Sequence, residues 1–190
     1  MAIRSQDISA GFLVSPLSGA ATVLAANAPV WSLRNISTTR SLLITRVQVG
    51  FATTTAFTNA QALLYQLFFA RGFTASDTAG TAVALTANQN KARTSLATLN
   101  SVNMQICTAA ALTAGTRTLD AVALASAIGT VGTVGTTMPM TTLYQHDSDD
   151  YPLFLAQDEG LVIQSAIVMG AVGVGNITVN IAFSEFVSYT

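Results

Sequence analysis

Residues 176–187 read NITVNIAFSEFV, and this stretch decides the fold class. Apolar side chains recur at odd-numbered positions, namely Ile177, Val179, Ile181, Phe183 and Val187. The even-numbered positions from 176 to 184 carry polar or small residues. Because successive side chains of a strand point to opposite faces, this period of two predicts a β-strand with one buried face.

Other segments repeat the strand signal. SLLITRVQVGF at 41–51 is apolar on both faces at first and then on one. QALLYQLFFARGF at 61–73 fits helical as well as strand spacing, but its aromatic residues and Gly72 favour a strand. Shorter strands are expected around 28–35, 82–86, 102–109, 118–124 and 160–169. Turns rich in Gly, Asn, Asp and Pro separate them, which predicts an all-β, single-domain jelly roll or related antiparallel β-sandwich.

A helix is possible at only one place. Residues 91–99, KARTSLATL, contain no helix breaker, so a helical stretch could occupy 90–99.

The N-terminal segment differs from the rest of the chain. Residues 1–29 include two prolines and two glycines that interrupt any regular element. We therefore expect an extended arm or an added edge strand at 1–29, followed by the β-sandwich domain at 30–190. The arm has too many apolar side chains to leave in water, and its candidate subunit-interface residues are Ile3, Phe12, Leu13, Val14 and Leu17.

The chain carries little charge. Asp, Glu, Lys and Arg make up 9% of it, against about 25% in a typical soluble domain. Four long runs contain none of these residues: 8–33, 47–70, 121–145 and 160–184. A surface of Ala, Thr, Ser, Asn and Gly suits burial against other subunits, because a charge there would have to be desolvated or paired. This composition predicts a structural subunit of an assembly, with further copies of itself among its partners.

Composition also argues against several classes of protein. A net charge of −1 provides no basic field for phosphates, so we expect no direct binding to nucleic acid. Thr, Asn, Gln, Gly and Pro break the uncharged runs, whereas a membrane-spanning helix needs about 20 predominantly apolar residues. Arg4 and Asp7 interrupt the N-terminus, which therefore does not resemble a signal peptide. The lone Cys107 predicts a buried small side chain and synthesis in a reducing compartment.

Chemical motifs are sparse. His146, the only histidine, stands in YQHDSDDYP, where it could serve Ser148 as a base or join Asp147, Asp149 and Asp150 around a cation. Loop neighbours do not supply a triad, the chain has no GxSxG motif, and the spacing is not that of an EF-hand. A solvated acidic turn is the preferred interpretation, and no catalytic, cofactor or metal residue is predicted.

A glycine-rich run, GTVGTVGT at 129–136, lacks the GK[ST] ending of a phosphate-binding loop. It is interpreted as a flexible loop.

Two further residues are candidates for a subunit interface. Glu185 continues the apolar face of its strand, where it could emerge into solvent, pair with an arginine or form an ion pair between subunits. Trp31 fits either the core or an interface.

Three segments carry a resemblance to a known class of protein. They are YQLFFARGFTASDTAGTAVALTANQNK at 65–91, ICTAAALTAGTRTLD at 106–120, and YPLFLAQDEGLVIQSAIVMGAVGVGNITVNIAFSEF at 151–186. In this order they resemble small β-rich virion proteins of tailed bacteriophages, which carry a TGGT-like turn, an "aLTagt" turn and a closing segment that ends in an aromatic residue before a glutamate. Residues 78–81 read TAGT and depart slightly from the first turn, and Phe183 stands at the aromatic position before Glu185.

The resemblance implies a capsid cement or decoration protein in the virion, made in the cytoplasm of a bacterial host. Its expected partners are the major capsid protein or other virion subunits. Another phage subunit of tail, fibre or shell is the next interpretation, followed by a carbohydrate-binding β-sandwich, and an enzyme is the least favoured.

Overall fold

The computed structural model describes residues 19–22, 24–83, 102–147, 152–170 and 172–187, which form strands and no helix. The strands are β1 (Gly19–Thr22), β2 (Ala28–Asn35), β3 (Arg40–Thr55), β4 (Gln61–Arg71), β5 (Gly80–Ala82), β6 (Val102–Cys107), β7 (Thr118–Leu119), β8 (Ala125–Val131), β9 (Thr137–Gln145), β10 (Leu153–Leu155), β11 (Gly160–Ser165) and β12 (Val174–Val187). The possible helix at 90–99 lies outside the described residues.

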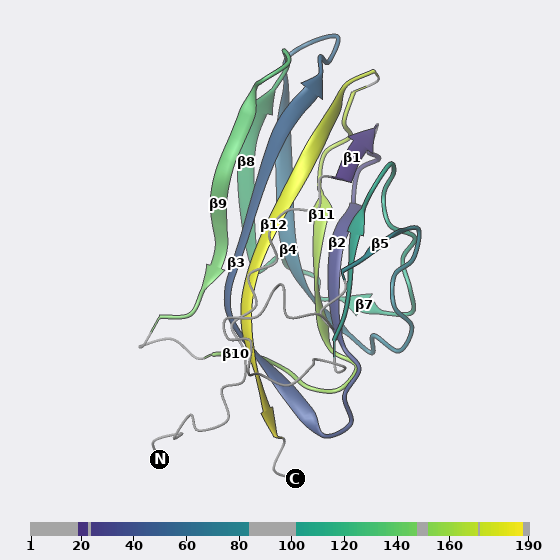
Figure 1. The fold of residues 1–190 in the computed structure, drawn as a ribbon, viewed down its shortest axis with the longest axis vertical. Helices are drawn as coiled ribbons and strands as arrows, with labels where there is room; N and C mark the ends of the chain where they lie inside the picture. The colour runs from purple at the N-terminus through teal and green to yellow at the C-terminus, as the bar shows by residue number, and fades with distance from the viewer. Residues whose placement is uncertain (1–18, 23, 84–101, 148–151, 171, 188–190) are drawn as a thin grey trace.

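Two antiparallel sheets form the molecule (Figure 1). The seven-stranded sheet has the order β5-β6-β2-β11-β4-β7, with β8 also paired to β4. The five-stranded sheet has the order β1-β12-β3-β10, with β9 also paired to β3. Its centre is the long β3–β12 ladder, which runs from Thr55 opposite Val174 to Arg40 opposite Val187. The predicted all-β sandwich of two antiparallel sheets is confirmed.

The core lies between the sheets and follows the alternation of the sequence. Ile177, Val179, Ile181 and Phe183 are all buried on β12. On β4, Leu63, Tyr65, Leu67 and Phe69 are buried in this core, with strand rather than helical spacing. Ala70 is also buried, in a separate small cluster with Phe73 and Val162.

The run at 129–136, interpreted as a flexible loop, is a connection between strands only in part. Its first three residues complete β8, residues 132–136 form a turn, and β9 begins at Thr137. β8 pairs with β4 and β9 with β3, so this turn takes the chain from one sheet to the other. Two of its glycines are required by the local geometry. A Cβ on Gly129 would lie 2.7 Å from Cγ of Met138, and Gly135 has a φ of +85°, which side chains rarely adopt. The loop interpretation was therefore wrong for residues 129–131, where close packing requires Gly129, while Gly135 is required by its left-handed backbone.

The described part of the N-terminal segment belongs to the sandwich. β1 pairs with Val174–Ile177 of β12 at the edge of the five-stranded sheet. Leu24, which follows, is 1% exposed and packs in the core. The arm residues Ile3, Phe12, Leu13, Val14 and Leu17 lie outside the described residues.

Candidate interaction surface

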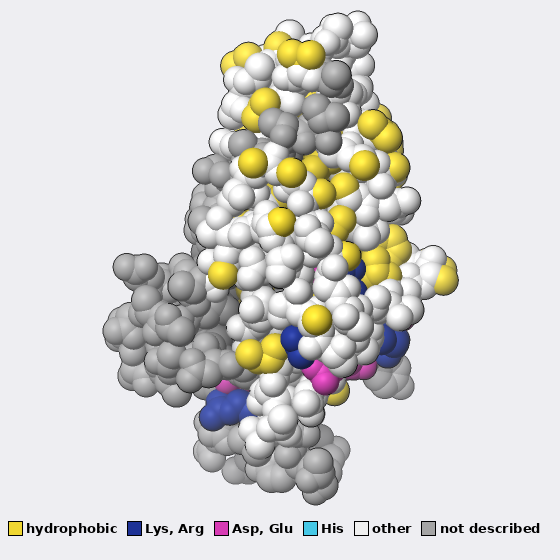
Figure 2. All heavy atoms as spheres, turned by 90° about the vertical axis from the view of Figure 1, so that its right-hand side faces the viewer, with side chains coloured by type: hydrophobic (Ala, Val, Ile, Leu, Met, Phe, Trp, Pro, Cys, Tyr) yellow, Lys and Arg dark blue, Asp and Glu magenta, His cyan; other side chains and the backbone are white. Residues whose placement is uncertain are grey.

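The described charged side chains gather toward one end of the sandwich. There β2, β4 and β12 end and β3 and β11 begin, and their terminal residues or the adjoining turns carry most of the charges. We call this the charged end and define it by Arg34, Arg40, Arg71, Asp77, Arg117, Asp120, Asp158, Glu159 and Glu185. Seen from the side, its basic and acidic groups occupy only the lower half of the molecule (Figure 2).

One ion pair at this end is buried. Asp77 accepts hydrogen bonds from Nε of Arg117 at 2.9 Å and Nη2 at 2.8 Å, and from the backbone N–H of Gly115 at 2.8 Å. The two side chains are 0% and 4% exposed, respectively. The guanidinium also lies 5.4 Å from the centre of the Phe73 ring. These contacts join the loops after β4 and before β7, so the pair has a structural role.

The more exposed charges are also paired within the chain. Arg34 donates to Asp158 at 2.7 Å. Arg71 makes two hydrogen bonds to Asp120, at 2.8 and 3.1 Å, and lies 3.4 Å from Glu159. The charged end therefore presents ion pairs that are already formed rather than a field of one sign.

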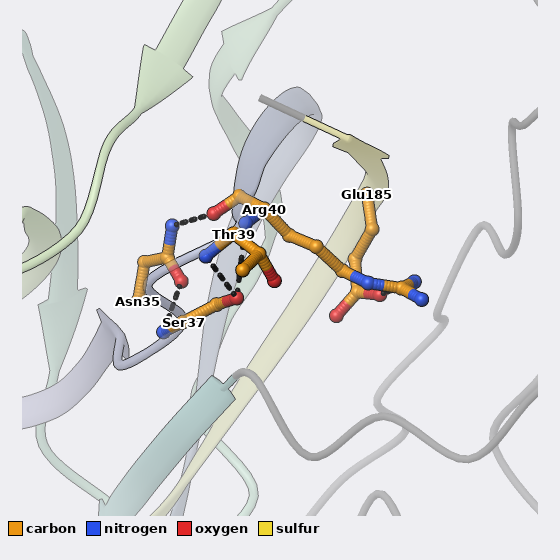
Figure 3. A network of polar contacts seen from close by, with 5 residues as sticks. All are labelled: Asn35, Ser37, Thr39, Arg40 and Glu185. Carbon is orange, nitrogen blue, oxygen red and sulfur yellow. Dashed lines mark hydrogen bonds and ion pairs between the residues drawn. The ribbon is translucent and has the colours of Figure 1, made fainter. Parts of the chain in front are cut away.

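Glu185 belongs to a network at the β2–β3 corner (Figure 3). Its Oε2 accepts a hydrogen bond from Nη1 of Arg40 at 2.8 Å, and its side chain is 3% exposed. The amide of Asn35 donates to the carbonyl of Arg40 at 2.8 Å, and the Ser37 hydroxyl accepts the N–H of Arg40 at 3.0 Å. Burial raises the pKa of Glu185, while hydrogen bonding and attraction to Arg40 lower it. The structure thus gives Glu185 an arginine partner within its own chain.

Among the described residues, the opposite end carries no charge. It consists of residues 24–27, 56–60, 132–136, 166–170 and 172–173, which belong to four connections that each pass from one sheet to the other. None of these four connections contains Asp, Glu, Lys, Arg or His. Each lies inside one of the four charge-free runs of the sequence, so the fold brings the middles of all four runs together at one place. We call this the uncharged end.

Aliphatic side chains stand exposed on the uncharged end. Val134 is 65% exposed, Ile167 38%, Val168 56% and Val172 68%. We refer to these four residues as the apolar cap. Figure 2 shows hydrophobic side chains over the upper part of the molecule, where no charged group is visible.

Backbone contacts join the connections beneath the cap. The N–H of Phe57 donates to the carbonyl of Gly132 at 2.8 Å, and the Phe57 ring lies so close to Gly173 that a Cβ there would overlap it. The N–H of Met169 donates to the carbonyl of Leu24 at 2.8 Å. The cap therefore rests on loops that are fastened to one another.

The cap residues were not singled out from the sequence. The four charge-free runs of the sequence were the available signal. Only the strand order shows that the middles of these runs meet at one end of the sandwich.

Other candidate residues have different positions. Trp31 is 1% exposed in the core, so its side chain is not available to another subunit. Cys107 is free and buried, as expected, and burial raises its pKa to about 11, which keeps the thiol protonated. The backbone N–H of His146 donates to the carbonyl of Thr45, whereas residues 148–150 lie outside the described part. Among the described residues, no three His, Cys, Asp or Glu side chains form a metal-binding group.

Comparisons with protein-family models, curated proteins and solved structures gave no match for this chain. Within the described ranges there is no helix long and apolar enough to span a membrane.

Proposed function

We propose that the protein is a structural subunit of a bacteriophage virion, and specifically a capsid cement or decoration protein. The observation that carries this proposal is the segregation of charge. Charged groups are paired with one another at one end, while at the other end four connections lack charge and two of them expose aliphatic side chains. Such a surface suits lasting contact with protein, because little polar surface has to be desolvated.

The role proposed is mechanical. Burial of apolar surface contributes about 25 cal/mol per Å², and many copies on one particle multiply the effect of a modest contact. The partners proposed are the major capsid protein or other virion subunits. The arm residues Ile3, Phe12, Leu13, Val14 and Leu17 remain predicted subunit-interface residues.

The test is the location and copy number of the protein in purified phage particles. Quantitative mass spectrometry would give its stoichiometry, and antibody labelling in the electron microscope would give its position. A cement protein should occur in fixed proportion to the major capsid protein and label the head. Labelling confined to the tail would favour another virion subunit instead, and absence from purified particles would overturn the proposal.

A further inference from the structure

We propose that the apolar cap is the surface through which copies of this chain bind one another. The four cap residues Val134, Ile167, Val168 and Val172 lie on connections that are fastened together, so they form part of one end rather than four separate sites. The inference goes beyond the proposed virion role, because it specifies a surface and an occupant that hold whether or not the particle is a phage.

Electrostatics selects a second copy as the occupant. All four connections of the uncharged end lack charged residues. A partner that brought a charge to this surface would have to desolvate it without finding an opposite charge. The matching surface must therefore be uncharged over a similar extent, and the uncharged end of a second copy meets this requirement. The charged end does not compete, because its charges are already paired within the chain.

Backbone geometry at Val172 provides a second, independent observation. Val172 has φ +80°, a left-handed conformation that is unfavourable for a β-branched residue. Its side chain is 68% exposed, so the isolated chain gains little burial in return. Strained residues persist where the surroundings hold them, often at binding sites. The strained backbone fixes the direction of this side chain, and contact with a second copy would bury it.

The experiment uses the full chain and compares three exposed valines. Val134→Asp and Val168→Asp place a charge in the cap. Val122→Asp is the matched control, because Val122 is 78% exposed but lies in the connection between β7 and β8, away from the uncharged end. Analytical ultracentrifugation over a range of concentrations gives the association constant of each protein. Circular dichroism and thermal melting verify that each variant is folded.

We expect the wild-type chain to self-associate, each cap variant to weaken association at least tenfold, and Val122→Asp to behave as the wild type. A wild-type chain that stays monomeric would overturn the proposal, as would cap variants that associate normally or a control that dissociates to the same degree. A monomeric wild type that enters virions, with cap variants that do not, would assign the cap to another virion protein. Conversely, the chain could associate through the cap and yet be absent from virions. That result would support this inference and overturn the proposed function.

Discussion

The two ends of this sandwich are connected by the same strands but are held together by different interactions. At the charged end, ion pairs supplement the backbone hydrogen bonds between connections: Asp77 with Arg117, Arg34 with Asp158, and Arg40 with Glu185. At the uncharged end, backbone hydrogen bonds, close glycine contacts and the ring of Phe57 hold the connections together. The ion-paired charges of the described residues therefore stabilise this chain's own fold, and recognition at the uncharged end must depend on shape and apolar burial.

The largest effect is expected from breaking the buried ion pair of the charged end. Asp77→Asn removes the carboxylate and leaves the guanidinium of Arg117, which is 4% exposed, without an opposite charge. We expect the free energy of unfolding to fall by about 3–5 kcal/mol, measured by urea denaturation. Asp120→Asn is the control, since it breaks a solvent-exposed pair with Arg71 and should have a far smaller effect. Equal losses in the two variants would contradict the structural role of the buried pair.

The uncharged end should be most sensitive at Phe57. Phe57→Ala removes the ring that packs against Gly173, in the region where the turn after β8 is hydrogen-bonded to the β3–β4 connection. We expect a loss of about 3 kcal/mol in the free energy of unfolding, as for other large-to-small changes in a core. Val134→Ala, on the exposed turn nearby, should change it by less than about 0.5 kcal/mol. If Phe57→Ala had as small an effect as Val134→Ala, the connections would not be held together by this ring.

A smaller and pH-dependent effect is expected at Glu185. Burial raises the pKa of this carboxyl above its ordinary value near 4.5, against the opposing effect of Arg40. The folded state therefore holds this proton more tightly than the unfolded state, so its contribution is present below the unfolded pKa and is lost as pH rises through the folded pKa. Relative to Glu185→Gln, the wild type should lose stability as pH rises from below 4.5 toward neutrality. Denaturation curves of both proteins at several pH values test this, and a difference that does not change with pH would contradict it.

The sequence predicted the features that depend on neighbouring residues. The alternation in β12 and β4 needs only a period of two, and the structure buries Ile177, Val179, Ile181 and Phe183 on β12 and the alternate side chains from Leu63 to Phe69 on β4. The loop interpretation was wrong for residues 129–131, because the close contact between Gly129 and Met138 of the next strand cannot be recognised from a glycine-rich sequence.

Long-range pairing was beyond the reach of the sequence pattern. Pairing of Glu185 with an arginine was one of the alternatives considered from the sequence, but the arginine was not identified. Arg40 lies 145 residues away in the chain, and the β3–β12 ladder brings it near. The four charge-free runs indicated an assembly surface, yet only the strand order brings their middles to one end.

A small change in stability, together with the sharpest contrast between folding and association, is expected at Val172. Val172→Gly places a glycine at a φ of +80°, which removes the backbone strain of valine there and should raise the free energy of unfolding. The greater conformational freedom of glycine in the unfolded chain should lower it. The two contributions should leave the free energy of unfolding within about 1 kcal/mol of the wild type. Self-association should nevertheless weaken, because the variant loses an exposed aliphatic side chain of the apolar cap. Denaturation measured at a concentration where the chain is monomeric, together with ultracentrifugation, separates these quantities. A large loss of stability would show that Val172 supports the isolated fold, and unchanged association would remove it from the surface between copies.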